Sequence, residues 1–263
     1  MKVLILGGNG MLGPWVVRSL KNFHDILLTD INDPPKSYKG DYQKLSVDDI
    51  DQVIATAKGM DVIVNLSVLR WDRKLAFEVN TIGNYAMMLA AKENNIKKVI
   101  NTGPHYQLVG TTYEDWDFNL NPDMPPQPGT RLYALTKSLG QEICRVFSID
   151  NDIHVLTLLF YNMKHHWNLS GPENSTLDYH QDMNVPYTTA WPDCGEAIRC
   201  AVELPLERLN SKCESFFILP DLPHNKFNNI KTKSVLGWNP LYKLEKLWTK
   251  DMRTPESHNT EGF

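Results

Sequence analysis

No long apolar run occurs in this chain of 263 residues. A membrane-spanning helix needs about 18 consecutive apolar residues, and no stretch approaches that length. An excess of positive charge is absent too, because 31 aspartate and glutamate residues outnumber 27 lysine and arginine residues. We therefore expect neither a membrane nor a nucleic acid among the partners of this protein.

Cysteine is scarce as well. The chain has four cysteines, and none has the spacing of a metal-ligand pair: Cys144, Cys194, Cys200 and Cys213. We expect no metal site, and reduced, mostly packed thiols in a cytoplasmic protein. The remaining composition, 42% apolar and 22% charged, is typical of a globular protein with a full α/β core.

A glycine pattern stands at the amino terminus. The apolar residues 3–6 are followed by Gly7, Gly10 and Gly13 and then by an amphipathic stretch at 14–20. This order predicts a buried strand, a tight turn and a helix start, where free backbone N–H groups can hold a pyrophosphate. Gly7 would permit the turn, Gly10 the close approach of phosphate, and Gly13 the packing of helix on strand.

Asp30 ends the next apolar run, about 20 residues after the glycine turn. At that place a carboxylate would accept a hydrogen bond from the adenosine ribose and would repel a 2′-phosphate. The sequence thus favours NAD over NADP as cofactor. The alternative is that Asp30 is a solvated acid at the end of a strand.

Strand-like and helical patterns alternate over the first 160 residues, which predicts parallel βαβ units. Expected strands lie at 3–6, 26–29, 43–45, 61–66, 98–102 and 155–160. After Tyr161 the segment 165–192 reads as irregular. Helical patterns return at 193–203, where Asp193 is expected as the N-cap, and at 243–248. We predict an α/β fold with a Rossmann-like doubly wound parallel sheet. Residues 1–163 would form the NAD-binding part, and 164–263 a small, largely irregular substrate-binding part of the same compact unit.

Tyr133 and Lys137 are four residues apart, hence on one face of a helix. A nearby cation and a positive nicotinamide ring both favour phenolate, so Tyr133 could act as a base while Lys137 holds the nicotinamide ribose. The same spacing recurs at Tyr242 and Lys246, but past the predicted sheet, where a surface helix is the natural interpretation. Tyr133 instead follows the fourth long predicted strand, beside the expected cofactor crevice.

These motifs fall in one order along nearly the whole chain: Gly7, Gly10, Gly13, Asp30, residues 61–67, Tyr133, Lys137, Asn162, Asp193 and residues 236–240. In that order and spacing the chain resembles the extended short-chain dehydrogenases/reductases, the NAD-dependent epimerase/dehydratase family. The resemblance implies that the pyrophosphate is held by Gly7, Asn9, Gly10, Met11 and Leu12, next to Gly13. It places Asp30 and Ile31 at the adenosine end and Leu66, Ser67 and Val68 on the nicotinamide side. It makes Tyr133 the acid/base and Lys137 its electrostatic partner. It also implies a homodimer through helices near 80–92 and 131–147.

The chain departs from the family pattern at the catalytic hydroxyl. That position falls on Gly103 or Pro104, so Thr102 or His105 must substitute, or the step is weakened. The alternative for His105 is a packed or solvated loop residue. No acid follows Thr102, which disfavours sugar dehydration. Where many members carry an arginine that clamps a substrate carboxylate, this chain has Leu159.

The leading hypothesis is an NAD-dependent oxidoreductase acting on a secondary alcohol of a sugar, sugar acid or related small polyol. In it, Tyr133, Lys137 and Thr102 are the candidate catalytic residues, and His105 and Asn162 the candidate substrate-binding residues. Two alternatives stay open. One is a nucleotide-sugar epimerase, and the other is an NAD-binding sensor or partner protein that has lost catalysis.

Overall fold

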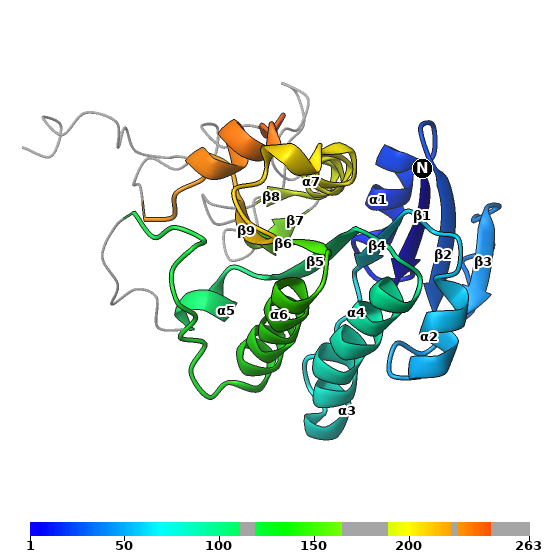
Figure 1. The fold of residues 1–263 in the computed structure, drawn as a ribbon. Coiled ribbons are helices and arrows are strands. Elements are labelled where there is room, and N and C mark those ends of the chain that lie inside the picture. The colour runs from blue at the N-terminus through cyan, green and yellow to red at the C-terminus, as the bar shows by residue number, and fades with distance from the viewer. Residues whose placement is uncertain (111–118, 165–188, 222–225, 243–263) are drawn as a thin grey trace, which may run out of the picture.

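The computed structural model describes residues 1–110, 119–164, 189–221 and 226–242. Within them, seven parallel strands form one sheet in the order β3-β2-β1-β4-β5-β6-β9 (Figure 1). The strands are β1 Lys2–Leu6, β2 Asp25–Asp30, β3 Asp41–Lys44, β4 Val62–Asn65, β5 Lys98–Pro104, β6 His154–Phe160 and β9 Cys213–Ile218. Because the strand order reverses between β1 and β4, a crevice opens at their carboxyl ends. The predicted Rossmann-like doubly wound sheet is confirmed.

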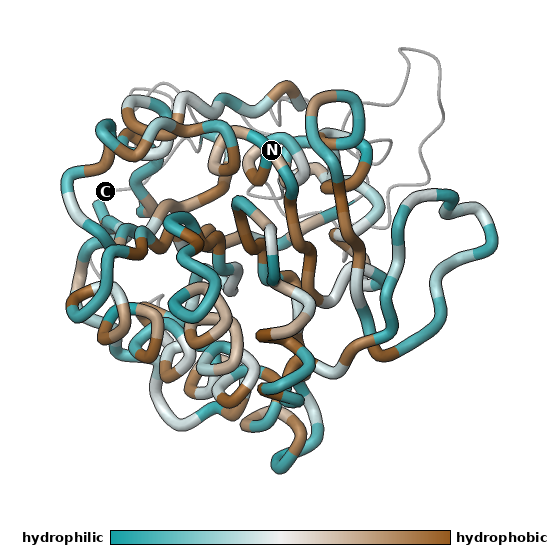
Figure 2. Tube along the Cα trace, turned by 45° about the vertical axis from the view of Figure 1, so that its right-hand side comes forward, coloured by the Kyte–Doolittle hydropathy of each residue, from teal (hydrophilic) through white to brown (hydrophobic). Residues whose placement is uncertain are grey.

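Helices cover both faces of the sheet (Figure 1). On one face α1 Gly13–Leu20 packs against α7 Trp191–Glu203. On the other face lie α2 Ile50–Thr56, α4 Gly83–Glu93 and α6 Leu132–Asp150. The alternation of side chains along β1 serves both layers, since Val3 and Ile5 join the core under α1 and α7 while Leu4 and Leu6 join the other. Burial on both faces explains why β1, β4 and β6 are mostly apolar, and apolar runs cross the centre of the molecule in Figure 2.

Shorter elements complete the described chain. They are α3 Arg73–Phe77, the π-helical turn η1 Glu78–Ile82, α5 Tyr106–Val109, the paired strands β7 Met163–Lys164 and β8 Thr189–Ala190, η4 Leu206–Arg208 and η5 Thr232–Leu236. None of the described helices has the length and apolar character needed to cross a membrane.

Strand β9, which pairs in parallel with β6, is not among the strands expected from the sequence. The run that forms it, Cys213–Ile218, begins with polar residues and therefore lacks the apolar signal of the other strands. Glu214 is only 3% exposed and is stabilised there by the Lys231 ammonium, 2.9 Å from its Oε2 atom. An ion pair thus allows an acid inside a strand that sequence patterns alone would not accept.

The prediction that Asp193 caps a helix is wrong. α7 begins at Trp191, and Ala190 is its N-cap. The Asp193 carboxylate instead accepts hydrogen bonds from the backbone N–H groups of Leu241 at 2.9 Å and Tyr242 at 3.2 Å, which ties residues 241–242 to α7. The expected helix at 243–248, and with it Lys246, lies outside the described residues, as does most of the segment 165–192.

Candidate active site

The glycine turn joins β1 to α1 at the mouth of the crevice. Gly7 has a φ of +73°, and a Cβ there would lie 2.6 Å from the backbone of Ser67. A Cβ on Gly13 would lie 1.8 Å from the carbonyl oxygen of Gly8, so only glycine lets α1 start this close to the turn. Beside Gly10 the space is more open, since the nearest atom to a Cβ would be 3.3 Å away. The turn and the amino end of α1 therefore fit a diphosphate.

Asp30 lies at the end of β2 and faces this turn. Its Oδ2 atom accepts a hydrogen bond from the backbone N–H of Asn9 at 3.0 Å, and its Oδ1 atom accepts one from the backbone N–H of Asn32 at 3.1 Å. The Asn9 side chain reaches away from the turn, to the carbonyl oxygens of Asn32 and Asp33. Ile31, 58% exposed, follows directly. The carboxylate thus has a fixed orientation and lone pairs left to accept a ribose hydroxyl.

A cavity of about 290 Å³ continues from the turn along the carboxyl ends of β1, β4 and β5. It brings together most of the residues expected near the cofactor: Gly7, Gly10, Met11, Leu12, Leu66, Val68, Thr102, Tyr133 and Lys137. Ser67 is buried beside it. Glycines of the turn line its end next to β1, and large apolar and aromatic side chains line much of the rest.

Lys137 is held at the base of this cavity by main-chain carbonyls. Its Nζ atom donates to the carbonyl oxygen of Ser67 at 2.9 Å and to that of Thr102 at 3.0 Å. The side chain is 2% exposed, and burial lowers its pKa to about 7. The ammonium group therefore links the ends of β4 and β5 to α6.

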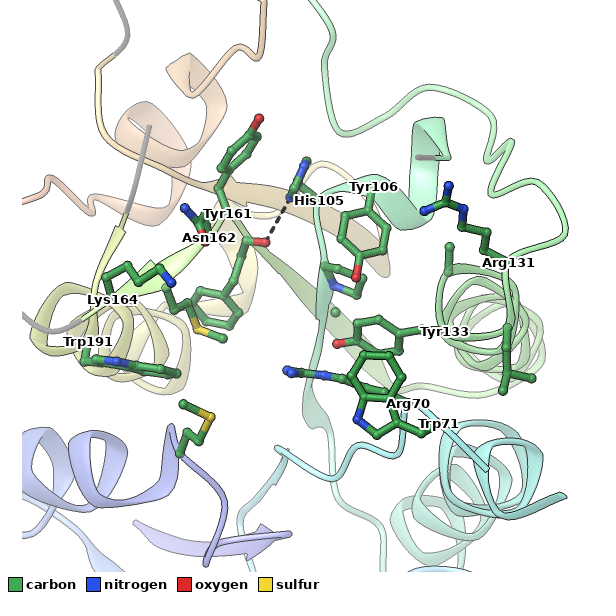
Figure 3. Close-up of a pocket in the computed structure, with 17 residues that line it drawn as sticks. Arg70, Trp71, His105, Tyr106, Arg131, Tyr133, Tyr161, Asn162, Lys164 and Trp191 are labelled. Carbon is green, nitrogen blue, oxygen red and sulfur yellow. Dashed lines mark hydrogen bonds between the residues drawn. The ribbon is translucent and has the colours of Figure 1, made fainter. Parts of the chain in front are cut away.

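Tyr133 lies in the first turn of α6, where its ring packs edge-on against Tyr106 at 5.9 Å between centroids. The guanidinium of Arg70 lies over the same ring, with Cζ 5.2 Å from its centroid. Burial raises the pKa of the Tyr133 phenol, while the charge and side-chain hydrogen bond of Arg70 act to lower it. Figure 3 shows the Tyr133 hydroxyl and the Arg70 guanidinium pointing into one cavity.

The residues at the end of β5 make contacts within the protein. The Thr102 hydroxyl donates to the carbonyl oxygen of Asn65 at 2.7 Å and is 7% exposed. The His105 ring stacks on Tyr161, with centroids 3.7 Å apart, and burial lowers its pKa to about 3. His105 is therefore uncharged at neutral pH and is packed among aromatic rings, although it also lines the neighbouring larger cavity.

This larger cavity, of about 970 Å³, opens above Tyr133. Side chains from several loops line it, including the predicted Asn162. Four others were not predicted from the sequence: Arg70, Tyr106, Arg131 and Lys164. None of the described residues that line it carries a carboxylate. The signal for Arg70 was its place two residues after Val68, at the end of the predicted nicotinamide-side loop. Tyr106, Arg131 and Lys164 carry no such signal.

Comparisons with known proteins agree with this geometry. The model of a family described as the NAD dependent epimerase/dehydratase family matches residues 3–170. A comparison with curated proteins found no match.

Three solved structures illustrate the likeness in fold. A short-chain dehydrogenase/reductase superfamily protein from Agrobacterium tumefaciens with bound NAD gives a TM-score of 0.74 at 16% identity, covering 94% of each chain. Uronate dehydrogenase from Agrobacterium tumefaciens gives 0.72 at 17% identity, over 94% of this chain and 86% of that one. UDP-N-acetylglucosamine 4-epimerase from Bacillus cereus gives 0.70 at 17% identity, over 93% and 94%.

Proposed function

Because this chain belongs to the NAD-dependent epimerase/dehydratase family, we propose that it is an NAD-dependent oxidoreductase acting on a secondary alcohol of a sugar, sugar acid or related small polyol. The observation that carries this proposal is the place of Tyr133. Its side chain lines both the cavity on the glycine-turn side and the larger one above it. A phenol there stands between a bound cofactor and a bound substrate, where an acid/base must lie.

Each half of the site has its own task in this mechanism. The glycine turn and the amino end of α1 hold the cofactor's diphosphate, and Asp30 accepts hydrogen bonds from its ribose. Bound NAD supplies the hydride acceptor and a positive ring charge. Tyr133, as phenolate, takes the proton of the substrate hydroxyl, and the charge of Arg70 favours that phenolate. Lys137 holds the ends of β4 and β5 on the cofactor side of the site. His105 and Asn162 bind the substrate from the far wall of the larger cavity.

The lining of the larger cavity supports a polar, hydroxyl-rich substrate. A volume of about 970 Å³ is at the upper end for small-molecule sites, which usually span about 300–1,000 Å³. Tyrosine, arginine, lysine and asparagine side chains line it alongside apolar ones, and such groups bind hydroxyl-rich ligands by hydrogen bonds.

The test is turnover by the purified protein with NAD and a panel of aldoses, sugar acids, sugar alcohols and nucleotide sugars, followed by the absorbance of the reduced cofactor. Tyr133→Phe is expected to lower kcat by about 10²–10⁴-fold, because it removes the acid/base. Tyr106→Phe, which removes the neighbouring phenol, is the matched comparison and is expected to lower kcat far less.

Other outcomes separate the alternatives. Retained NAD with product isomerisation and no spectral change would identify an epimerase in place of a dehydrogenase. NAD binding without turnover on any member of the panel, together with a stable complex with another protein, would identify a binding protein that has lost catalysis. Full turnover by Tyr133→Phe would exclude the mechanism itself.

We also propose a homodimer formed through α4 and α6, which lie side by side (Figure 1). Five large apolar side chains on η1, α4 and α6 are exposed: Ile82, Tyr85, Leu139, Val146 and Ile149. Covering such an apolar face with a second copy removes it from water. Sedimentation velocity at micromolar protein tests this, and a monomer would refute it.

We propose a cytoplasmic setting because all four cysteines are free thiols.

A further inference from the structure

The end of β5 offers no hydroxyl to the reacting oxygen. The Thr102 hydroxyl already donates to Asn65, across the sheet. Gly103 has no side chain, and a Cβ there would lie 1.7 Å from the side-chain oxygen of Gln107. His105 is stacked on Tyr161 and directs Nδ1 toward the carbonyl oxygen of Phe160, 3.4 Å away. If Tyr133 acts on a substrate oxygen, a second hydrogen-bond donor to that oxygen must come from another element.

Arg70 is placed to donate that second hydrogen bond. It lies in the loop after β4, lines both cavities and covers one face of the Tyr133 ring. Its Nε atom is buried and has no hydrogen-bond partner among the described residues. The described part of the chain thus supplies no acceptor for this N–H group, and a ligand oxygen in the cavity would be an acceptor for the outer N–H groups of the same guanidinium. In Figure 3 the guanidinium extends into the cavity beside the Tyr133 hydroxyl.

The loop that carries Arg70 is attached to the helix that carries Tyr133. The Asn80 side chain accepts from the backbone N–H of Leu69 at 3.3 Å and donates to its carbonyl oxygen at 2.7 Å. The same amide donates to the Thr136 hydroxyl of α6 at 3.0 Å. With the bond from Lys137 to Ser67, α6 holds this loop at two points. The relative position of Arg70 and Tyr133 is therefore set by buried hydrogen bonds rather than by the exposed part of the loop.

We propose that Arg70 is a second catalytic residue, whose guanidinium donates a hydrogen bond to the same substrate oxygen that exchanges its proton with Tyr133. This inference rests on the proposed function. In the oxidation direction the alcohol C–H bond breaks and its hydride goes to NAD. The O–H proton goes to the Tyr133 phenolate, and the electron pair of the O–H bond forms the second bond of the C=O group. Arg70 keeps its proton throughout, because a guanidinium does not deprotonate in proteins.

The two cations of the site then have different tasks. Lys137 is turned toward the main chain on the cofactor side, with its Nζ on two carbonyl oxygens. Arg70 lines both cavities and lies beside the Tyr133 hydroxyl, where negative charge develops on the substrate oxygen as the proton leaves. A cationic donor at that point stabilises the transition state more than the ground state.

The first test needs neither substrate nor turnover. In protein labelled with 3-fluorotyrosine, the ¹⁹F resonance lost in Tyr133→Phe reports the Tyr133 phenol and is titrated with pH. The groups that face this phenol are Arg70, Tyr106 of α5 and, one turn along α6, Lys137. Arg70→Gln is expected to raise the Tyr133 pKa by about one pH unit, and Arg70→Lys by less than half of that, because the charge is retained.

Arg131→Gln is the matched control, since Arg131 lies on the same cavity but its charge acts on Tyr106 and not on Tyr133. It should leave the Tyr133 titration unchanged. No shift in Arg70→Gln would overturn the proposal.

The second test is kinetic and uses whichever neutral sugar and sugar acid of the panel turn over. Arg70→Gln is expected to lower kcat by about 10²–10³-fold on both, with little change in KM, since one donor to the reacting oxygen is lost. Arg70→Lys should restore part of kcat, and calorimetry should find wild-type NAD affinity in both variants. A rise in KM confined to the acid, with kcat unchanged, would make Arg70 a carboxylate clamp and overturn the proposal. If Tyr133→Phe retains turnover, the proposed function itself fails; if Tyr133→Phe is inactive and Arg70→Gln is not, only this inference fails.

Discussion

The two cavities of the crevice are built from different parts of the chain. The smaller one, on the cofactor side, reaches the glycine turn at Gly7 and Gly10 and the buried Lys137, whose ammonium group is held by two main-chain carbonyl oxygens. The larger one, on the substrate side, has walls of long side chains that come from loops after β4, β5 and β6 and from the start of α6. A turn that requires glycine and a lysine held by main-chain carbonyls cannot change without disturbing the sheet, whereas side chains on the surrounding loops can be exchanged. One side of the site is therefore a constant of the fold, and the other is where substrate choice is made.

The comparison predicts that the cofactor side does not tolerate even one added methyl group. In Gly13→Ala the new Cβ would meet the carbonyl oxygen of Gly8 at 1.8 Å, so α1 must move away from the turn. We expect a loss of about 3 kcal/mol in the free energy of unfolding, measured by denaturant titration, since overpacking against backbone is costly. NAD binding, measured by calorimetry, should weaken by at least about tenfold, which corresponds to about 1.4 kcal/mol.

Gly59 provides the control for that substitution. It has a φ of +75°, and no atom lies within 4 Å of the position that a Cβ would take there. Gly59→Asn should therefore change stability little, because asparagine tolerates this backbone conformation. A Gly13→Ala variant as stable as Gly59→Asn would contradict the view that main-chain packing defines the cofactor side.

His105, on the wall of the larger cavity, is predicted to make the free energy of unfolding depend on pH. Burial lowers the His105 pKa to about 3, against an ordinary value of 6.5. Between those values the unfolded chain binds a proton that the folded chain does not, so His105 makes stability rise with pH in that window and fall as the pH drops below about 6.5. In His105→Phe, which keeps an aromatic ring on Tyr161, the loss of stability from pH 7 to pH 5 should shrink by about 2 kcal/mol.

Denaturant titrations at the two pH values measure this effect. Phe227→Leu is the control, because it alters the ring that packs on His105 without removing a titrating group. It should keep the wild-type difference between pH 7 and pH 5. If His105→Phe keeps that difference as well, His105 is not the buried titrating group of this wall.

The outer wall of the substrate side is expected to give the smallest effect on stability. Trp71 lines both cavities but is 88% exposed. Trp71→Ala should change the free energy of unfolding by less than about 0.5 kcal/mol, as exposed substitutions usually do. It should raise KM for the substrate several-fold, since the exposed ring is free to pack against a ligand bound in the cavity. A stability loss as large as that of Gly13→Ala would erase the distinction between the two sides.

The same distinction explains what the sequence could predict. The glycine turn, Asp30 and the alternation of strands and helices follow from local backbone requirements, so they can be read from neighbouring residues. β9 was missed because Glu214 is neutralised by Lys231, a partner 17 positions further along the chain that no local pattern reveals. Arg70 was missed because its place two residues after Val68 does not reveal that the fold brings its guanidinium over the Tyr133 ring.

The position of His105 shows a second kind of limit. The sequence leaves two interpretations open, a group facing the ligand and a packed ring. The structure places the ring both against Tyr161 and on the wall of the larger cavity. Which contacts dominate depends on Tyr161 and Phe227, from two further segments of the chain. No single stretch of the sequence reveals that these two rings pack on His105.

The place of β9 at the edge of the sheet, next to β6, has a consequence for synthesis of the protein. On the ribosome, β6 is synthesised long before Cys213–Ile218, the only strand that covers its outer edge in the described structure. Until those residues emerge, a nascent chain presents the apolar edge of His154–Phe160 with unpaired N–H and carbonyl groups, a template for another unfinished chain. Translation that stops short of β9 therefore yields an aggregation-prone product and a substrate for chaperones, rather than a smaller working enzyme.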